Sequence, residues 1–205
     1  MPTWTIVVAG GSGERFGERK QYLALGGERV LDWALRAAAE HTDGVVLVVP
    51  ADVVDQPEPL ASIVVAGGAT RSASVRAGLA AVPTDATTIV VHDAARPVPV
   101  PQLWEHVLEQ VATGADAVVP AVPVADTLRE VGGSTVDRTR YVTVQTPQAF
   151  RAAALRAAHA AGGEGTDDAS LVEARGGRVV VVDGDPANIK ITTPLDLSVA
   201  ELLCR

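Results

Sequence analysis

The segment from residue 10 to residue 21, GGSGERFGERKQ, combines four glycines with the cations Arg15 and Lys20. Glycine lets backbone N–H groups approach a ligand closely, and cations favour a ligand of negative charge. The segment begins like the dinucleotide pattern G-x-G-x-x-G, but Phe16 stands in place of the third glycine, and the Walker Gly-Lys-Ser/Thr is missing. We therefore predict a phosphate-binding loop for a highly charged ligand, with a NAD-type loop and a plain turn as alternatives.

A second glycine pair, Gly67-Gly68, follows the apolar run Ile63–Val65. Because glycine has no Cβ, this pair could bring backbone amides and carbonyls close to a ligand. Ser72 or Ser74 could cap or begin the helix that follows. Taken alone, the segment fits a ligand-binding turn and an ordinary helix cap equally well.

A carboxylate, Asp93, directly follows the strand-like run Thr88–His92. A buried carboxylate needs a metal ion, a cationic partner or water. Beside His92 and Arg96, Asp93 could hold Mg²⁺ on a phosphate or form a structural ion pair. Its place at a strand end favours a functional role, because ligands of α/β sheets gather beyond the carboxyl ends of the strands.

Other polar residues have more ordinary expected roles. Lys190 is expected inside a short apolar strand, as an edge-strand cation or as a cation directed into a cleft. The pair Asp167-Asp168 is expected to supply an N-cap and a favourable first-turn charge to a helix, with a catalytic dyad as the alternative. Three histidines without metal-ligand spacing are expected on solvated helix faces: His41, His106 and His159.

Short apolar runs alternate with helical patterns along the chain, and these elements must position the polar residues. The strand-like runs are Thr5–Ala9, Val45–Val49, Ile63–Val65, Thr88–His92, Ala117–Val122 and Arg178–Val182. The helical patterns are Val30–His41, Ser72–Ala81, Gln102–Ala112, Phe150–Ala161, Asp168–Arg175 and Asp196–Leu203, with Pro101 and Pro194 suited to first turns. The alternation predicts one domain over residues 1–205, of α/β class, with a doubly wound, largely parallel, Rossmann-like sheet.

The segment Pro123–Gln145 breaks this alternation. It has two β-like halves around Gly132-Gly133, a plausible hairpin turn, and it is too polar for a core strand pair. We predict a protruding β-arm at about residues 123–145. Because such an arm has little to pack on within its own domain, a partner subunit could cover it, which suggests a homodimer.

Composition narrows the class of protein. The net charge of −8 offers no basic footprint for nucleic acid. The single cysteine, Cys204, excludes an internal disulfide and suits a reducing cytoplasm. No apolar run reaches the ~20 residues needed to span a bilayer, and no secretory signal is recognisable. A cytoplasmic protein without nucleic-acid or membrane partners is expected.

Read together in chain order, the loops resemble 2-C-methyl-D-erythritol 4-phosphate cytidylyltransferases of the non-mevalonate isoprenoid pathway. HDAARP at 92–97 and TPQ at 146–148 are specific to this family and its nearest sugar-phosphate relatives. Ala69 departs from the pattern, because relatives often carry Asp there. The remaining matching segments are Gly11-x-Gly13-x-Arg15, Lys20–Tyr22, residues 67–79, Asp126-Thr127, Thr135–Arg138, Thr166–Ser170 and Asn188–Lys190.

The resemblance implies transfer of CMP from CTP to 2-C-methyl-D-erythritol 4-phosphate with release of pyrophosphate, Mg²⁺ as cofactor, and a homodimer in which the arm completes the partner's site. The resemblance assigns transition-state stabilisation to Arg15 and Lys20. It assigns the acceptor phosphate and its surroundings to Thr127, Arg138, Thr146, Lys190, Asp93 and Arg96, with Asp93 also a metal ligand, directly or through water. It assigns the nucleotide to Val8, Ala9, Gly10, Gly11, Gly13, Gly68, Arg71, Ser74 and Ala94.

Three other hypotheses remain open from the sequence. A ribitol 5-phosphate cytidylyltransferase resembles the same loops and differs in its acceptor pocket. An NAD-type oxidoreductase would need a glycine loop that runs directly into a helix. A non-catalytic nucleotide-binding subunit would be expected to have lost Arg15 or Lys20, and both are present.

Overall fold

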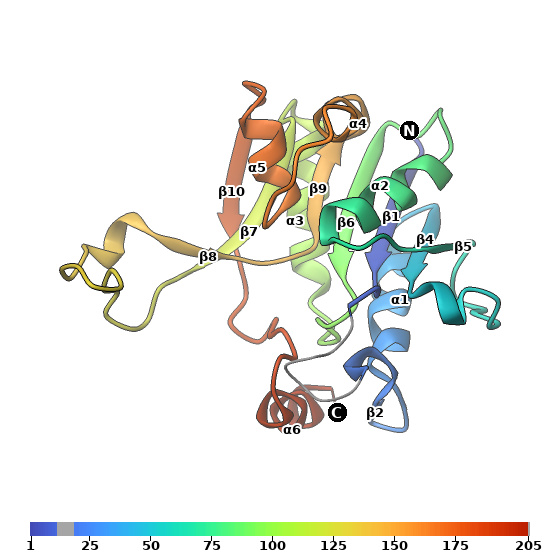
Figure 1. Cartoon of the computed structure of the whole chain (residues 1–205), viewed down its shortest axis with the longest axis horizontal. Helices are drawn as coiled ribbons and strands as arrows, with labels where there is room; N and C mark the ends of the chain where they lie inside the picture. The colour runs from blue at the N-terminus through green and yellow to red at the C-terminus, as the bar shows by residue number, and fades with distance from the viewer. Residues whose placement is uncertain (12–18, 205) are drawn as a thin grey trace.

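A computed structural model of the whole chain describes residues 1–11 and 19–204. Within this part, eight strands form one sheet in the order β10-β7-β9-β6-β1-β4-β5, with β8 beside β7 (Figure 1). The strands are β1 Thr3–Val8, β4 Gly44–Val49, β5 Ile63–Ala66, β6 Thr88–Asp93, β7 Ala117–Pro123, β8 Val142–Val144, β9 Gln148–Arg151 and β10 Val179–Asp183. All six strand-like runs of the sequence thus form strands, with bounds shifted by a few residues at most.

The sheet is largely parallel, as predicted. β1 lies between β4 and β6 and is parallel to both, and β5 extends this half of the sheet. All six residues of β4 are buried, so this strand is covered on both faces, whereas the residues of the edge strand β5 are half-buried or exposed. Because the parallel strands point the same way, Val8 and Asp93 end at one edge of the sheet as register partners.

One strand was assigned wrongly from the sequence. The expected helix from Phe150 begins instead at Ala152, and Phe150 belongs to β9, which is antiparallel to both β6 and β7. Phe150 is fully buried, opposite Ile89 on one side and Ala117 on the other. A four-residue strand that runs directly into a helix is too short to show a period that separates strand from helix, so only its partner strands decide.

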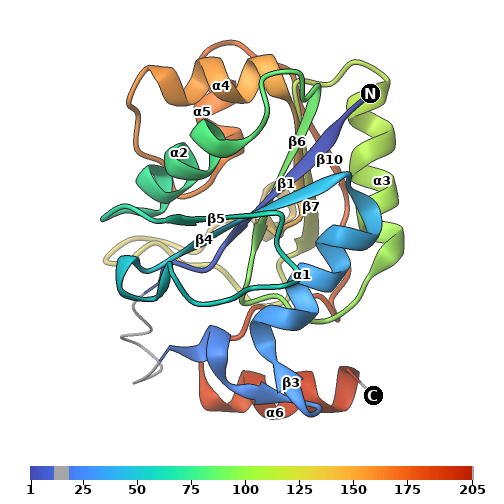
Figure 2. The ribbon, with the colours of Figure 1, turned by 90° about the vertical axis from the view of Figure 1, so that its right-hand side faces the viewer.

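Helices cover both faces of the sheet (Figure 2). α2, α4 and α5 lie on one face, where Leu79 and Leu155 pack into the core. α1 and α3 lie on the other face, with Leu35 and Trp104. The helices are α1 Val30–His41, α2 Arg71–Ala81, α3 Pro101–Ala112, α4 Ala152–Ala160, α5 Asp168–Glu173 and α6 Pro194–Leu203. Pro101 and Pro194 open α3 and α6, as the sequence predicted.

A smaller apolar cluster lies at the end of the sheet where the strand-end loops gather. There the hairpin of β2 (Ala24–Leu25) and β3 (Glu28–Arg29) contacts α6, and Leu25, Ile191 and Ala200 are buried together. The 3₁₀ turns η1 (Lys20–Tyr22) and η2 (Ala51–Val53) lie in the loops after β1 and β4. Leu23, the residue that follows η1, packs against this cluster.

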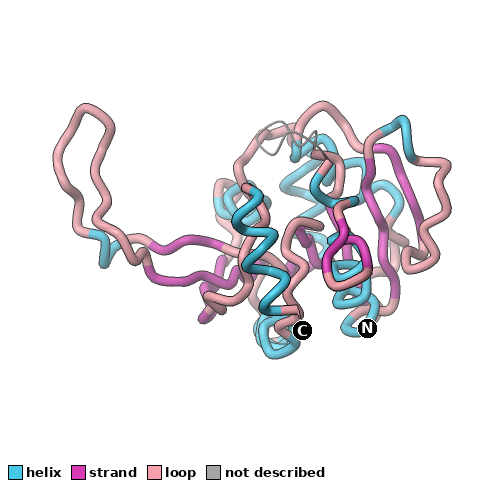
Figure 3. The backbone as a smooth tube through the Cα atoms, turned by 90° about the horizontal axis from the view of Figure 1, so that it is seen from below, coloured by secondary structure: helices cyan, strands magenta, loops and turns pink. Residues whose placement is uncertain are grey.

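The protruding arm is confirmed (Figures 1 and 3). At its base β8 pairs with β7, and further out a bridge joins Arg129 to Thr135 across a turn in which the Gly133 N–H donates to the Glu130 carbonyl. A short turn, η3 (Arg138–Arg140), completes it. Apolar side chains remain exposed along the arm, including Val131, Tyr141 and Val142.

The three helical histidines differ from one another. His106 is exposed, as predicted. His41 is half-buried, with its ring stacked on Trp104 at 5.4 Å, and His159 is only 3% exposed, so the prediction of a solvated face was wrong for His159. Its burial arises from contacts between α4 and α5 that a helical period does not reveal.

In the part of the chain that the structure describes, no helix has both the length and the apolar character needed to cross a membrane.

Candidate active site

The loops after β1, β5 and β6 surround a cleft of about 520 Å³. The parallel strands end at the same edge, so residues distant in sequence meet there. The cleft contains Lys20, Asp93, Lys190 and most of the residues predicted for the nucleotide. The lining residues are Val8, Ala9, Gly10, Gly11, Lys20, Gln21, Gly68, Ala69, Thr70, Arg71, Ser74, Asp93, Ala94, Ala95 and Lys190.

The second glycine pair brings the start of α2 close to the loop after β5. A Cβ on Gly68 would lie 2.5 Å from the Ala73 Cβ, so only glycine fits there. Ser74 is buried and its Oγ accepts from the Gly68 N–H at 3.2 Å. The N-cap of the helix is Thr70, whose side chain accepts from the Ala73 N–H at 3.0 Å. Ser72 lies in the first turn, so the sequence placed the start of the helix correctly but not its cap. Thr70 was missed because three hydroxyl residues lie within five positions.

A buried glutamine joins the two ends of the first loop. Gln21 is 4% exposed, and its Nε2 donates to the Ala9 carbonyl at 2.8 Å and to the Gly11 carbonyl at 3.4 Å. These bonds hold η1 against the end of β1. Since Lys20 is the first residue of η1, Gln21 also fixes the backbone from which the Lys20 amine reaches the cleft.

The chain contains two lysines, Lys20 and Lys190, and both line the cleft. Of the 15 arginines that complete the 17 cationic residues, Arg71 also lines this cleft. An overall charge of −8 therefore coexists with a local concentration of ammonium groups at this edge of the sheet. Such a placement suits an anionic ligand, because nearby opposite charges are attracted most strongly in a partly desolvated cleft.

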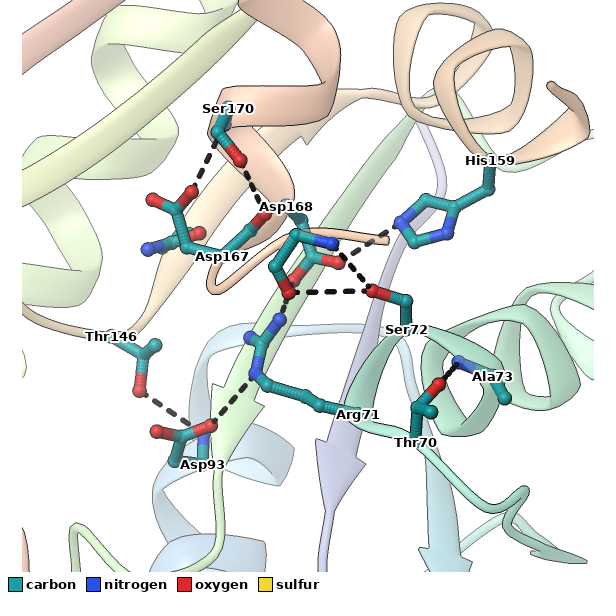
Figure 4. Close-up of polar contacts among 12 residues, drawn as sticks. Thr70, Arg71, Ser72, Ala73, Asp93, Thr146, His159, Asp167, Asp168 and Ser170 are labelled. Atoms are coloured by element: carbon teal, nitrogen blue, oxygen red, sulfur yellow. Dashed lines mark hydrogen bonds and ion pairs between the residues drawn. The ribbon is translucent and has the colours of Figure 1, made fainter. Parts of the chain in front are cut away.

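Asp93 forms ion pairs with two cations on the wall of the cleft. Its carboxylate lies 2.6 Å from Lys190 Nζ and 3.7 Å from Arg71 Nε (Figure 4 shows the contact with Arg71). Burial alone would raise the pKa of Asp93, but the charges of Lys190 and Arg71 outweigh it and lower the pKa to about 2. Asp93 is therefore ionised at neutral pH.

Lys190 lies in an irregular segment between β10 and α6, so the prediction of a strand was wrong. Three bonds replace the strand pairing. Asn188 is fully buried and its Nδ2 donates to the Thr146 carbonyl at 3.0 Å, Arg96 donates to the Asn188 carbonyl at 2.6 Å, and the Ile191 N–H donates to the Ala95 carbonyl. Side-chain bonds of this kind leave no apolar period in the sequence.

A second cavity of about 310 Å³ adjoins the first and shares Arg71, Asp93 and Lys190 with it. Thr146 and Arg96, both predicted for the acceptor, line this smaller cavity. Arg96 Nε is buried and has no hydrogen-bond partner among the described residues. The other lining residues are Val144, Gln145, Gln148, Thr166 and Asp167.

Thr146 also links Asp93 to His92. The Thr146 hydroxyl accepts from the Asp93 N–H at 3.0 Å and lies 3.2 Å from His92 Nδ1. His92 Nε2 lies 3.2 Å from the Arg96 carbonyl, which can only accept, so Nε2 carries the hydrogen. In the neutral ring, Nδ1 then accepts from the Thr146 hydroxyl. Burial lowers the pKa of His92 to about 4, although the neighbouring Asp93 opposes the shift.

This burial predicts a loss of stability in mild acid. The unfolded chain protonates the His92 imidazole below about pH 6.5, whereas the folded protein does so only near pH 4, so stability falls between these values by an amount on the order of 3 kcal/mol and then levels off. Between pH 7 and pH 4.5, Tm should fall less in His92→Gln than in the unaltered protein. The exposed His106→Gln is the control, and equal losses in all three proteins would contradict this role of His92.

The predicted site residues fall into three groups. The described nucleotide residues, together with Lys20, meet in the larger cleft, and Asp93, Arg96, Thr146 and Lys190 line the smaller cavity. Gly13 and Arg15 lie outside the described residues. Thr127 and Arg138 lie on the arm and line neither cavity; Arg138 donates to the Ala125 carbonyl. Gln21, Gln148, Thr166 and Asp167 line the cavities and were not predicted as site residues, although all four belong to matching segments.

A largely parallel α/β sheet with a cationic, glycine-walled cleft at its strand ends fits the nucleotidyltransferase class of enzymes, and the comparisons with known proteins show this class. The model of the IspD family, 2-C-methyl-D-erythritol 4-phosphate cytidylyltransferase, matches residues 3–205. The chain is 45% identical to the enzyme of that name from Nocardia farcinica, over 97% of this chain and 92% of the relative. It is also 45% identical to that of Saccharopolyspora erythraea, over 98% of each chain.

Solved structures agree with the family model. The crystal structure of 2-C-methyl-D-erythritol 4-phosphate cytidylyltransferase from Thermus thermophilus matches with a TM-score of 0.86 at 39% identity, over the whole of both chains. The chain belongs to the 2-C-methyl-D-erythritol 4-phosphate cytidylyltransferase family. Its activity is the transfer of a cytidylyl group to this sugar phosphate, and the ribitol 5-phosphate alternative is not favoured.

Proposed function

We propose that CTP occupies the larger cleft and that 2-C-methyl-D-erythritol 4-phosphate enters through the smaller cavity. The observation that carries this assignment is the shared wall: Arg71, Asp93 and Lys190 belong to both cavities. Two ligands that react must meet, and here they meet at a pair of cations. The acceptor phosphate attacks the α-phosphorus of CTP, the new P–O bond forms, and pyrophosphate departs with the electron pair of the broken bond.

The residues of this chain act by position and charge. Two phosphate groups repel each other as they approach, and the negative charge spreads over the equatorial oxygens at the transition state. Lys20 and Lys190 offer ammonium groups on the wall of the cleft, and Arg71 and Arg96 offer guanidinium groups deeper inside. Cations fixed before the reaction stabilise that charge without reorganisation. We further propose that Arg15 joins Lys20 in this role.

A magnesium ion fits the donor set in the cleft. Mg²⁺ keeps several waters and is usually bound by one or two carboxylates plus substrate phosphates. Among the described residues no group of three or more potential metal-ligating side chains exists, but Asp93 is an ionised carboxylate at the shared wall. We propose that Asp93 and the CTP phosphates hold Mg²⁺, directly or through water. The ion would neutralise phosphate charge; Lys190 and Arg71 orient the carboxylate that receives it.

We also propose a homodimer in which the arm of one subunit completes the site of the other. Thr127 and Arg138 match acceptor-binding positions of the family, yet they line neither cavity of their own chain. They lie on the arm, which extends away from the rest of the chain (Figure 1). The exposed apolar residues Val131, Tyr141 and Val142 would gain cover from a partner. The acidic composition and the single cysteine support a cytoplasmic setting for this enzyme.

The proposal predicts a specific pattern of substrate use. Each nucleoside triphosphate is combined with 2-C-methyl-D-erythritol 4-phosphate, ribitol 5-phosphate or another sugar phosphate, and pyrophosphate release is measured with and without Mg²⁺. Only CTP with the first acceptor, in the presence of a divalent cation, is expected to react rapidly. Preference for UTP or GTP would overturn the donor, and equal rates with ribitol 5-phosphate would overturn the acceptor specificity.

A further inference from the structure

Asp168 is a fully buried carboxylate whose position was expected to hold only a first-turn charge. Its neighbour Asp167 caps α5 as predicted, since the Ser170 N–H donates to Asp167 Oδ1 at 3.0 Å. Asp168 instead points into the protein, with 0% of its surface exposed. A buried carboxylate without partners would be strongly destabilising. The groups that surround Asp168 must therefore account for its presence.

Two side chains from other helices meet this carboxylate (Figure 4). Arg71, the first residue of α2, places Nη1 2.8 Å from Asp168 Oδ2. His159, near the end of α4, places Nε2 2.9 Å from Asp168 Oδ1. Both contacts are shielded, because His159 and Asp168 are almost completely buried. Asp168 is thus fixed from one side by a histidine and from the other by an arginine.

Arg71 is the only one of these three residues that reaches the cavities. It lines both the larger cleft and the smaller cavity, and its Nε faces Asp93 at 3.7 Å. Its guanidinium therefore lies between a carboxylate in the site and a carboxylate behind it. Burial alone would lower the pKa of Arg71, but the charges of Asp168 and Asp93 outweigh it and raise the pKa. Without Asp168, the guanidinium would be free to turn wholly toward Asp93.

Further contacts tie the same face of α2 to the loop that carries Thr166 and Asp167. Ser72 Oγ accepts from the Gly165 N–H at 3.2 Å, and Arg76 donates to the Gly163 carbonyl at 3.0 Å. The start of α2 belongs to the larger cleft, and the loop belongs to the smaller cavity. The Arg71–Asp168 ion pair belongs to the same set of contacts, and its arginine lies at the boundary between the two cavities.

We propose that Asp168 and His159 are positioning residues for the cytidylyl transfer: they hold the Arg71 guanidinium at the point where the two substrate phosphates meet. His159 orients the Asp168 carboxylate, and Asp168 orients Arg71. The inference rests on the proposed placement of the two substrates. A guanidinium held in place before the reaction stabilises the transition-state charge more than a mobile one does. Loss of Asp168 should therefore lower kcat by a larger factor than it raises the Kd for CTP.

A double-mutant cycle tests whether Asp168 acts through Arg71. The proteins are the unaltered enzyme, Asp168→Asn, Arg71→Met and the double variant, with Asp85→Asn as an exposed acid-to-amide control. Asp168→Asn is expected to lower kcat about 10- to 100-fold and to raise the Kd for CTP, measured by calorimetry without acceptor, about 3- to 10-fold. In the Arg71→Met background the same substitution should change kcat and Kd by less than about twofold.

The inference would be overturned if Asp168→Asn changed kcat and the Kd for CTP by the same factors with Arg71 present and in the Arg71→Met background. It would also be overturned if the Asp168→Asn enzyme had a kcat within about twofold of the unaltered enzyme. If Asp168→Asn does not fold, His159→Gln replaces it in the cycle under the same criteria, with His106→Gln as control. His159→Gln is expected to lower kcat about 3- to 10-fold. An unaltered enzyme that binds CTP but forms no product would contradict the proposed acceptor, and the CTP-affinity cycle would still decide the positioning role.

Discussion

Lys20→Ala is expected to lower kcat at saturating CTP and 2-C-methyl-D-erythritol 4-phosphate by about 100-fold or more. Lys20 lines the cleft, and the Gln21 bonds fix the backbone next to it. Loss of a preorganised donor to a developing oxyanion typically costs about 10²- to 10³-fold in kcat. Tm should change little, because Lys20 is only partly buried and packs no core. Pyrophosphate release and thermal unfolding measure the two quantities.

Arg19→Ala is the matched control for this change. Arg19 is adjacent to Lys20, but its guanidinium forms a two-pronged, exposed ion pair with Asp52 at 2.8 and 2.9 Å, and it lines neither cavity. An exposed pair of this kind contributes little to stability, because water and salt screen the two charges. Arg19→Ala should therefore keep kcat within about threefold. Near-normal turnover of Lys20→Ala would remove Lys20 from the mechanism.

The outline of this site could be predicted because it depends on the ends of apolar strands. Thr5–Ala9 and Thr88–His92 are recognisable as buried strands from composition alone, and parallel strands bring Val8 and Asp93 to one edge. The loop motifs that follow these two strands are then expected at the same edge of the sheet. Lys20 and Lys190, far apart in the chain, could be placed in one cleft only through the family resemblance, because spacing along the chain says nothing of this contact.

The parts that could not be predicted depend on contacts between distant elements. β9 is a strand because β6 and β7 flank it, and Phe150 alone does not show this. Asp168 is buried because Arg71 and His159 approach it from α2 and α4. A sequence pattern records which face of its own helix a residue occupies, but it does not record which charged group lies opposite. Acidic residues at helix starts are usually exposed, which made the ordinary interpretation of Asp168 the natural one.

The arm gives the second large expected effect, which depends on the proposed homodimer. Arg138→Ala should lower kcat/KM for the acceptor by about 100-fold, because Arg138 is proposed to contact the acceptor phosphate in the partner's site. In its own chain Arg138 lines neither cavity and donates to the Ala125 carbonyl. Arg129→Ala is the control on the same arm, where the Arg129 side chain donates to the Thr135 hydroxyl, and it should remain near full activity. Size-exclusion chromatography checks that both variants keep the dimer.

Mixed dimers distinguish action across subunits from action within one chain. Lys20→Ala and Arg138→Ala subunits are co-expressed with different affinity tags, and the heterodimer is isolated. If the arm serves the partner, one site carries both lesions and the other carries neither, so the heterodimer regains about half of the unaltered activity. If the arm serves its own chain, each site carries one lesion and activity stays about 100-fold low. Recovery can arise only when the cleft with Lys20 and the arm with Arg138 come from different chains, so a heterodimer as inactive as its parents would contradict the shared site.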